Sequence, residues 1–443
     1  MRRRILSLAP LLAVLATLTG SAQALPQPLP ERAAAPLTVS APPQAAARES
    51  FSPSTLTPDP FVEVMIKQVV SSTVLQVERE LAGELPVWVE DGWYTIATRH
   101  THSGTPIWKA TRYVGEHLAG LGLDVEYHAW ADATNPNVIG EVRGSVDPDE
   151  VWIIGAHLDD VVGTPGADDN ASGSAAVLVA ADILTQYEWG CTLRFALWTG
   201  EEQGMLGSKA YAQRANQEGE GIAGVLNLDM IAYNSPGSPP GMDLYYDPLL
   251  PATHDLAQLF ADVVEDYSLD LDPQVLAGGS GGSDHQSFWG FGYTAILAIE
   301  DMADFNPKYH RAGDTPANND LTYFTEFVRA SLGTFVHMTN CLLPNGTGAV
   351  EGQVTAESDG APLKAATLSF DDMAGHHYSV STDSDGYYTR TLPAGSYDLT
   401  VRRAGYIPRT VPGVVVQTDT VSELDLVLQE LFRMHLPLLI RRG

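Results

Sequence analysis

The chain has 443 residues, of which 44% are hydrophobic, and this length and composition suggest two or three globular folding units. Its formal net charge is −30, with 55 acidic and 25 basic residues. Nucleic acids and anionic membranes attract basic surfaces, so we expect no nucleic-acid partner. The excess of carboxylates instead favours solubility and the binding of cations.

The first 24 residues have the layout of a secretory signal peptide, with a basic start, an apolar stretch and an Ala22-Gln23-Ala24 end. We expect cleavage after Ala24 and export of the mature protein. The apolar run is too short for a membrane anchor, so no membrane insertion is expected once the signal is removed. Residues 25–57 are rich in Ala and Pro without a periodic apolar face, which predicts a linker or pro-segment.

Residues 58–343 alternate between helical and strand patterns. Helical spacing of apolar residues occurs at 62–70, 107–122, 171–187, 208–219, 252–269 and 323–343, and largely apolar strand patterns occur at 124–130, 150–157, 192–200, 224–233 and 294–301. Strands that are apolar almost throughout and that alternate with helices indicate a sheet covered on both faces. The prediction is one α/β domain with a largely parallel central sheet.

Histidines and carboxylates stand where several predicted strands end. His157 and Asp159 follow one strand, Glu201 and Glu202 follow another, and Asp229 lies near the end of a third. Because the carboxyl ends of parallel strands meet at one edge of a sheet, these side chains should converge there. They would repel one another unless a cation neutralised them, and nitrogen and oxygen ligands of this kind suit zinc.

Two zinc ions account for the number of candidate ligands better than one. Asp168, in the glycine-bounded loop "GADDNASG", can bridge the ions. His157 and Asp229 can then hold one ion, and Glu202 and His310 can hold the other.

Glu201 then remains as an acid without an ion to hold. A carboxylate beside an activated water is what general-base catalysis requires, so Glu201 is predicted to be the base. Asp159 is predicted to orient the imidazole of His157. Each feature alone has an ordinary explanation, since adjacent glutamates usually lie on solvated helix faces and "ADDNASG" could cap a helix. Their occurrence together, in order at predicted strand ends, favours a catalytic centre.

The segments "GAHLDD", "PGADDNASG", "LWTGEEQGMLGS", "NLDM", "GSDHQSF" and "YHRAGDT" resemble the secreted bacterial leucyl aminopeptidases and related co-catalytic zinc peptidases, a group that includes glutamate carboxypeptidases and glutaminyl cyclases. The resemblance extends from about Thr98 to the end of the closing helix. It implies a mixed, mainly parallel sheet flanked by helices, two zinc ions per chain, and peptide or protein substrates. It also implies the same five ligands and the same general base as the spacing does.

An aminopeptidase of this type would hold the free amino terminus of a peptide against the metals and acidic side chains. Met230, Phe305 and Tyr309 neighbour predicted ligands and could line a pocket for an apolar side chain, although they could equally belong to the core. Relatives can carry a cysteine pair around the Ser-Asp-His loop. This chain has "AGGSGGSDH" there without a cysteine, so the pocket shape does not follow from the resemblance.

Two other functions compete with this one. A carboxypeptidase of the same family would need basic side chains for a terminal carboxylate, and Lys308 and Arg311 are the candidates near the ligands. A surface-binding or adhesion protein would use the metal only structurally. Structural zinc sites are usually closed and built from Cys or His, so the carboxylate-rich set argues against that function.

Residues 349–430 follow a short predicted linker, 344–348, and show short alternating strands with the turn sequences "SDG", "PAG" and "AGY". This region resembles the carboxypeptidase regulatory-like, transthyretin-like β-sandwich. The pattern assigns no role to the tail, residues 431–443. Cys191 and Cys341 are a candidate disulfide in an exported protein, with two buried free thiols as the alternative.

Overall fold

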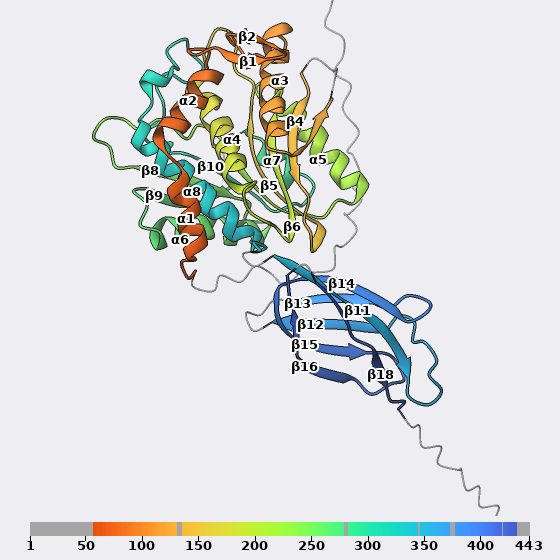
Figure 1. Cartoon of the computed structure of the whole chain (residues 1–443). Coiled ribbons are helices and arrows are strands. Elements are labelled where there is room, and N and C mark those ends of the chain that lie inside the picture. The colour runs from red at the N-terminus through yellow and green to blue at the C-terminus, as the bar shows by residue number, and fades with distance from the viewer. Residues whose placement is uncertain are drawn as a thin grey trace, which may run out of the picture. The chain divides into compact units, whose positions relative to one another are not determined.

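The computed structural model describes residues 56–130, 135–278, 282–343, 346–372, 377–418 and 420–431. The predicted signal peptide lies outside these residues, as do residues 25–55 of the predicted linker and residues 432–443 of the tail. Within the described residues, an α/β domain is followed along the chain by an all-β domain (Figure 1).

A mixed sheet of eight strands forms the centre of the α/β domain, which confirms the predicted fold class. In spatial order its strands are β3 (Asp124–His128), β4 (Asn137–Val142), β6 (Cys191–Trp198), β5 (Asp147–His157), β7 (Ile222–Leu228), β10 (Ala295–Glu300), β8 (Gly241–Tyr246) and β9 (Asp272–Ala277). The four central strands, β6, β5, β7 and β10, are parallel to one another, whereas β4 and β8 pair with them in antiparallel fashion. The carboxyl ends of the central strands therefore meet at one edge of the sheet.

Alternate residues of the central strands enter two apolar cores on opposite faces of the sheet. On β5, Ile154 and Ala156 belong to the larger core and Ile153 belongs to the smaller one. The larger core includes residues of α1 (Pro60–Gln68), α2 (Ser71–Leu81), α3 (Thr105–Gly120), α4 (Gly173–Leu184), α6 (Pro251–Asp266) and α8 (Leu321–Thr339), and the smaller core includes residues of α5 (Leu206–Glu218) and α7 (His285–Trp289). Because both faces are covered, these strands are apolar almost throughout.

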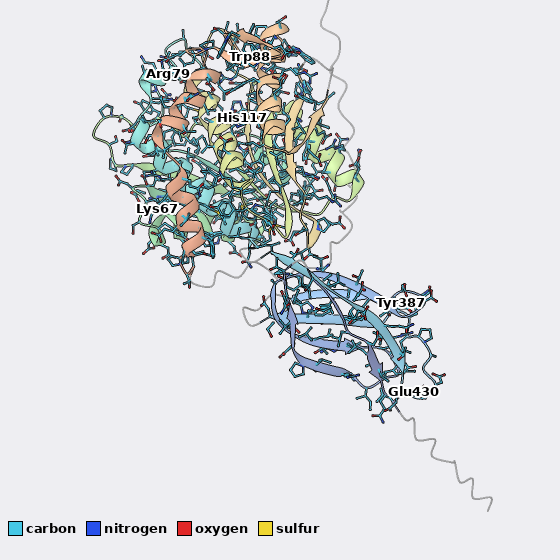
Figure 2. All side chains as sticks on the ribbon, in the orientation of Figure 1. Lys67, Arg79, Trp88, His117, Tyr387 and Glu430 are labelled. Atoms are coloured by element: carbon cyan, nitrogen blue, oxygen red, sulfur yellow. A yellow bond between two sulfur atoms is a disulfide. The ribbon has the colours of Figure 1, made fainter. Side chains whose placement is uncertain are left out.

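The helices turn polar side chains outward. Lys67 on α1 and Arg79 on α2 project from the domain (Figure 2), and their side chains are 70% and 40% exposed. A two-stranded hairpin, β1 (Val87–Val89) and β2 (Gly92–Tyr94), lies between α2 and α3 along the chain. In the described part of the chain, no helix combines the length and the apolar character needed to cross a bilayer.

Cys191, the first residue of β6, forms a disulfide with Cys341, which follows α8. The bridge joins residues that are 150 positions apart in the sequence. The backbone N–H of Gly190 also donates a hydrogen bond to the carbonyl of Cys341 at 2.8 Å. The structure therefore has the bridge rather than two free thiols.

The all-β domain consists of two four-stranded sheets that enclose a core of their own. One sheet has the order β14-β11-β17, with β18 also paired to β11, and the other has the order β13-β12-β15-β16. The strands are β11 (Thr347–Ala356), β12 (Thr367–Asp372), β13 (His377–Ser381), β14 (Tyr387–Pro393), β15 (Gly395–Arg402), β16 (Arg409–Val416), β17 (Val421–Glu423) and β18 (Leu426–Leu428). Inward residues such as Val350, Phe370 and Leu399 are fully buried, as expected of a sandwich.

Candidate metal centre

The loops that follow the four central strands carry the predicted site residues. His157 ends β5, Asp229 directly follows β7, Glu202 lies shortly after β6, and His310 lies in the longer segment after β10. Since these four strands are parallel, their loops leave the sheet at the same edge. The topology thereby brings together residues that are far apart in the sequence.

A buried turn, Ala167–Ser172, carries the two aspartates and leads into α4. Gly166 precedes the turn with a φ of +58°, a conformation that favours glycine. A Cβ atom at this position would lie 2.4 Å from the carbonyl oxygen of Asp169, so no other residue would fit without a shift of the backbone. The glycine in "PGADDNASG" is therefore required by the close approach of the turn to itself.

His157, Asp169 and Asp229 form the first group of potential ligands, and their donor atoms lie within 4.8 Å of one another. The Nε2 atom of His157 lies 3.2 Å from Oδ1 of Asp229 and 3.3 Å from Oδ1 of Asp169. The Nδ1 atom of His157 lies 3.1 Å from the carbonyl oxygen of Asp159. A proton on Nδ1 would donate to that oxygen and leave the Nε2 lone pair directed at the carboxylates. The hydroxyl of Ser283 donates to Oδ2 of Asp229 at 2.7 Å.

Asp169, Glu202 and His310 form the second group, again with donor atoms within 4.8 Å of one another. The Nε2 atom of His310 lies 3.2 Å from Oδ2 of Asp169 and 3.1 Å from Oε2 of Glu202. Asp169 thus presents one carboxylate oxygen to each group. A carboxylate shared in this way is what a pair of neighbouring divalent cations requires.

Asp168, the predicted bridging residue, does not belong to either group, and its neighbour Asp169 takes that position instead. The carboxylate of Asp168 points into the protein, where Oδ1 accepts a hydrogen bond from the backbone of Ala232 at 2.9 Å and Oδ2 accepts one from the amide of Asn306 at 2.8 Å. Successive side chains point in different directions from this turn, so only one of the two aspartates can face both histidines. The prediction of Asp168 as the bridge was wrong for this reason.

Burial and mutual repulsion raise the pKa values of two glutamates in this centre. Burial, together with the charges of neighbouring carboxylates, raises the pKa of Glu201 to about 10 and the pKa of Glu202 to about 9. Burial alone would lower the pKa of His157, but Asp229 and Asp169 raise it well above its usual range. The Oε1 atom of Glu202 is buried without a hydrogen-bond partner among the described residues. Divalent cations would offset this repulsion and satisfy that oxygen, so the donor set fits zinc.

Asp159 serves the site differently from the prediction. Its carboxylate lies 3.8 Å from Nδ1 of His157, and its carbonyl oxygen is the nearer acceptor. The carboxylate instead accepts hydrogen bonds from the hydroxyl of Thr101 at 2.7 Å and from the backbone N–H of Glu201 at 3.2 Å. Asp159 therefore fixes the backbone at Glu201. Thr101 has no sequence signal that would have identified it.

A cavity of about 340 Å³ opens beside both groups of potential ligands. Glu201 lies in its wall, as do the three predicted pocket residues Met230, Phe305 and Tyr309. The sequence did not single out the other apolar members of the wall, which are Tyr245, Leu297, Ile299 and Met302. These residues come from β8, from β10 and from the segment after β10, and they resemble ordinary core residues in the sequence.

Comparisons with known proteins identify a matching family for each of two regions of the chain. Residues 137–334 match the profile of Peptidase family M28, and residues 349–429 match the profile of the Carboxypeptidase regulatory-like domain. Both matches confirm the resemblances seen in the sequence motifs.

Curated relatives include Leucine aminopeptidase 2 of Trichophyton rubrum, which is 31% identical over 237 residues that make up 46% of each chain. Leupeptin-inactivating enzyme 1 of Streptomyces exfoliatus is 36% identical over 174 residues, which cover 38% of this chain and 37% of the relative. The chain thus spans less than half the length of these curated relatives.

The solved structures of the LapA aminopeptidase and of LapB, both from Legionella pneumophila, share the fold. LapA superposes with a TM-score of 0.55 at 19% sequence identity and covers 63% of this chain and 74% of its own. LapB gives a TM-score of 0.55 at 20% identity, with 63% and 75% of the two chains covered.

Proposed function

We propose that this chain, in which residues 137–334 match Peptidase family M28, is a secreted zinc aminopeptidase that releases apolar residues from the amino termini of peptides. The observation that carries the proposal is the arrangement of two donor groups around one shared carboxylate, that of Asp169. His157 and Asp229 would hold one zinc ion, and Glu202 and His310 would hold the other.

The catalytic steps fall to the residues around these ions. Bound zinc would supply Lewis acidity, which polarises a peptide carbonyl and makes a water molecule easier to deprotonate. The carboxylate of Glu201 would accept the proton of the attacking water and return it to the departing amine. Asp159 would hold Glu201 in place through the hydrogen bond to its backbone N–H. Because Glu201 is 9% exposed, bulk water would compete little for its proton.

The charge of the cavity favours an amino terminus over a carboxyl terminus. Four carboxylates line it, those of Asp169, Glu201, Glu202 and Asp229, and no Lys or Arg is among the described residues of its wall. With zinc bound to the other three, the carboxylate of Glu201 is the one left to attract a substrate ammonium group, whereas a terminal carboxylate would find no Lys or Arg among those wall residues. Lys308 and Arg311, the candidates for a carboxypeptidase, are not among the lining residues.

The apolar part of the cavity supports the preference for apolar side chains. Met230, Leu297 and Ile299 form a small buried cluster of their own, with Tyr245 and Phe305 packed against it. All five residues line the cavity. A leucine or methionine side chain that enters it would gain roughly 1.5–3 kcal/mol from burial.

Paired substrates and metal removal test the proposal. Leucine amide should be hydrolysed and N-acetyl-leucine amide should not, because only the first carries a free ammonium group. Removal of metal with 1,10-phenanthroline should abolish hydrolysis, and added zinc should restore it. Equal cleavage of both amides would reject the aminopeptidase assignment, and hydrolysis by metal-free protein would reject the zinc centre. A protein that binds zinc but hydrolyses neither substrate would favour the surface-binding alternative.

The proposed secretion rests on the amino-terminal sequence. Amino-terminal sequencing of protein recovered from the medium should begin at Leu25 or later. Recovery of a chain that retains Met1 would contradict export through a cleaved signal peptide.

A further inference from the structure

His310 is the ligand candidate that its immediate surroundings hold least firmly. Its side chain is 37% exposed, whereas those of Glu202 and Asp169 are each 6% exposed. Its backbone has a φ of +56°, a conformation that non-glycine residues seldom adopt. His310 stacks on Tyr309, with ring centroids 3.7 Å apart. Something else must therefore fix the distance between His310 and the rest of the second group.

Asn306 closes the turn that leads to His310. Its Oδ1 atom accepts a hydrogen bond from the backbone N–H of Lys308 at 2.8 Å, and its carbonyl oxygen accepts one from the backbone N–H of Tyr309 at 3.1 Å. Its own backbone N–H donates to Oε1 of Glu300, the last residue of β10, at 2.8 Å. Asn306 is 1% exposed, so its amide is satisfied entirely within the protein.

The amide of Asn306 also reaches the segment that carries the shared carboxylate. Nδ2 of Asn306 donates to Oδ2 of Asp168 at 2.8 Å, and Asp168 is the residue before Asp169. The other oxygen of Asp168 accepts from the backbone N–H of Ala232, in the segment that follows Asp229. Asp168 is thus a buried connection among three ligand-bearing segments, and Asn306 is its partner on the His310 side.

A second connection lies on the other side of His310. The carboxylate of Asp314 accepts hydrogen bonds from the backbone N–H groups of Asp168 and Asp169, at 3.0 Å and 3.2 Å. The chain around His310 is therefore fastened to the Asp168–Asp169 turn both before and after the histidine. The Asp314 connection is made to the backbone, so the Asn306 connection can be removed by itself.

We propose that Asn306 is a positioning residue that sets the distance between His310 and Asp169 and thereby the affinity for the zinc ion of the second group. The inference rests on the proposed function, because it presumes that zinc binds to these ligands. Partners that orient metal ligands from outside contribute to affinity because a ligand held in place loses less freedom on binding. The ion held by His157 and Asp229 shares only Asp169 with that site, so its affinity should be affected less.

The substitution Asn306→Asp isolates this contact. The two side chains have the same shape, and an aspartate retains the acceptor for the N–H of Lys308. It replaces the donor by an oxygen that faces the carboxylate of Asp168, so the connection becomes repulsive. Competition between metal-free protein and a chelator should then show that affinity for one of the two zinc ions falls by about 10–100-fold. The affinity for the other ion should fall less.

Two further variants identify the affected ion. His310→Ala removes a ligand of the second group directly and should weaken one ion. The double variant Asn306→Asp with His310→Ala should bind its remaining ion as tightly as His310→Ala alone, since both changes act on the same site. Asn318→Ala is the matched control. Asn318 donates to Oδ1 of Asn306 at 3.2 Å and not to Asp168, so its loss should leave both affinities unchanged.

Asn306→Ser guards against a general effect of the introduced charge, because serine can keep the turn acceptor but is too short to reach Asp168. It should weaken the same ion without unfolding the metal-free protein in a thermal melt. If the wild type binds two zinc ions, either of two results would overturn the inference. One is unchanged binding of both ions in Asn306→Asp and Asn306→Ser, and the other is equal weakening of both ions. A wild type that binds no zinc would overturn the proposed function and this inference together.

Discussion

Asp168 and Asp169 are identical neighbours, yet the turn gives them different surroundings. Asp169 faces His157 and His310, whereas Asp168 faces Ala232 and Asn306. The sequence predicts that a carboxylate from this loop reaches the site, because the loop precedes a helix near strand ends. It does not specify which carboxylate, since that depends on backbone dihedral angles within the turn.

Substitution of each aspartate should separate these two roles. Asp169→Asn removes the carboxylate common to both groups, so the protein should lose both zinc ions and all measurable hydrolysis. Asp168→Asn keeps a hydrogen-bonding side chain and should retain zinc with an affinity lower by about 10–100-fold. Zinc content after dialysis, measured by elemental analysis, distinguishes the two variants. Equal zinc loss in both would contradict the assignment of the bridge to Asp169.

Glu201 should be needed for turnover but not for metal. Glu201→Gln removes the proton acceptor and preserves the shape, so kcat should fall by about 10²–10⁴-fold while KM changes little. Zinc content should equal that of the wild type, because Glu201 belongs to neither ligand group. The measurement is steady-state hydrolysis of leucine amide with parallel metal analysis. A variant with near-normal kcat would remove Glu201 from the role of base.

Glu78 on α2 should make stability depend on pH. Burial, with a smaller contribution from Asp168 and Asp314, raises the pKa of Glu78 to about 8, although a hydrogen bond from Asn319 acts in the opposite direction. The folded protein then retains a proton that the unfolded chain loses near pH 4.5, the usual value. The free energy of unfolding should therefore fall as pH rises from about 5 to 8, by at most about 1.4 kcal/mol per pH unit from this group.

Glutamine has no titratable proton, so in Glu78→Gln the free energy of unfolding should fall less steeply as pH rises. Urea denaturation at several pH values gives the free energy of unfolding of both proteins. Its fall with rising pH should be steeper for the wild type than for the variant. Parallel slopes would show that Glu78 is ionised in the folded state at neutral pH.

At the level of elements, the sequence predicted the four central strands and β3, and it missed β4, β8 and β9 of the same sheet. The strands that carry site residues, β5, β6 and β7, are apolar on both faces, and that pattern does not depend on the rest of the structure. β4 lies on one side of the four central strands, β6, β5, β7 and β10, and β8 and β9 lie on the other side. β9 is largely half-buried or exposed, which weakens its apolar signal.

The hairpin of β1 and β2 has three residues in each strand, too few for a period to be recognised. Contacts within the site could not be predicted for a different reason. The bonds from Asn306 to Asp168 and from Thr101 to Asp159 join residues far apart in the sequence, and no local pattern reports them. Ligands at the ends of long apolar strands could therefore be predicted, whereas the residues that orient them could not.

The disulfide should stabilise the fold without affecting catalysis. Cys191 begins β6, and the site lies beyond the other end of that strand, roughly 23 Å away at about 3.3 Å per residue. Replacement of Cys191 and Cys341 by Ser should lower the free energy of unfolding by about 2–5 kcal/mol, because the unfolded chain regains the freedom of a long loop. Chemical denaturation and kcat, measured well below the melting temperature, test both parts. A large fall in kcat of the folded variant would contradict this separation.

At the scale of the whole molecule, the described residues form apolar cores that do not mix. The cores of the α/β domain draw on residues up to Leu342, and the core of the all-β domain draws on residues from Val350 onward. A domain with a core of its own can fold alone. The two profile matches, 137–334 and 349–429, fall on either side of the same division.

Removal of the all-β domain should therefore spare hydrolysis of small substrates. A chain that ends at Leu343 should fold and hydrolyse leucine amide with kcat and KM close to those of the full chain, because every residue of the cavity wall precedes this point. Comparison of the two proteins on soluble amides and on insoluble protein particles would show whether the second domain acts on access to substrate. Loss of activity toward the soluble amide would contradict independent folding.

The single carboxylate of Asp169 makes the two cation positions interdependent. Whichever ion arrives first would order that side chain and reduce repulsion among its neighbours, which prepares the place of the next. Reciprocity of linkage requires that departure of either ion weaken the one that stays. Occupancy should therefore rise more steeply than a simple hyperbola as free zinc increases, so that the protein would convert from inert to competent over a narrow range of metal supply.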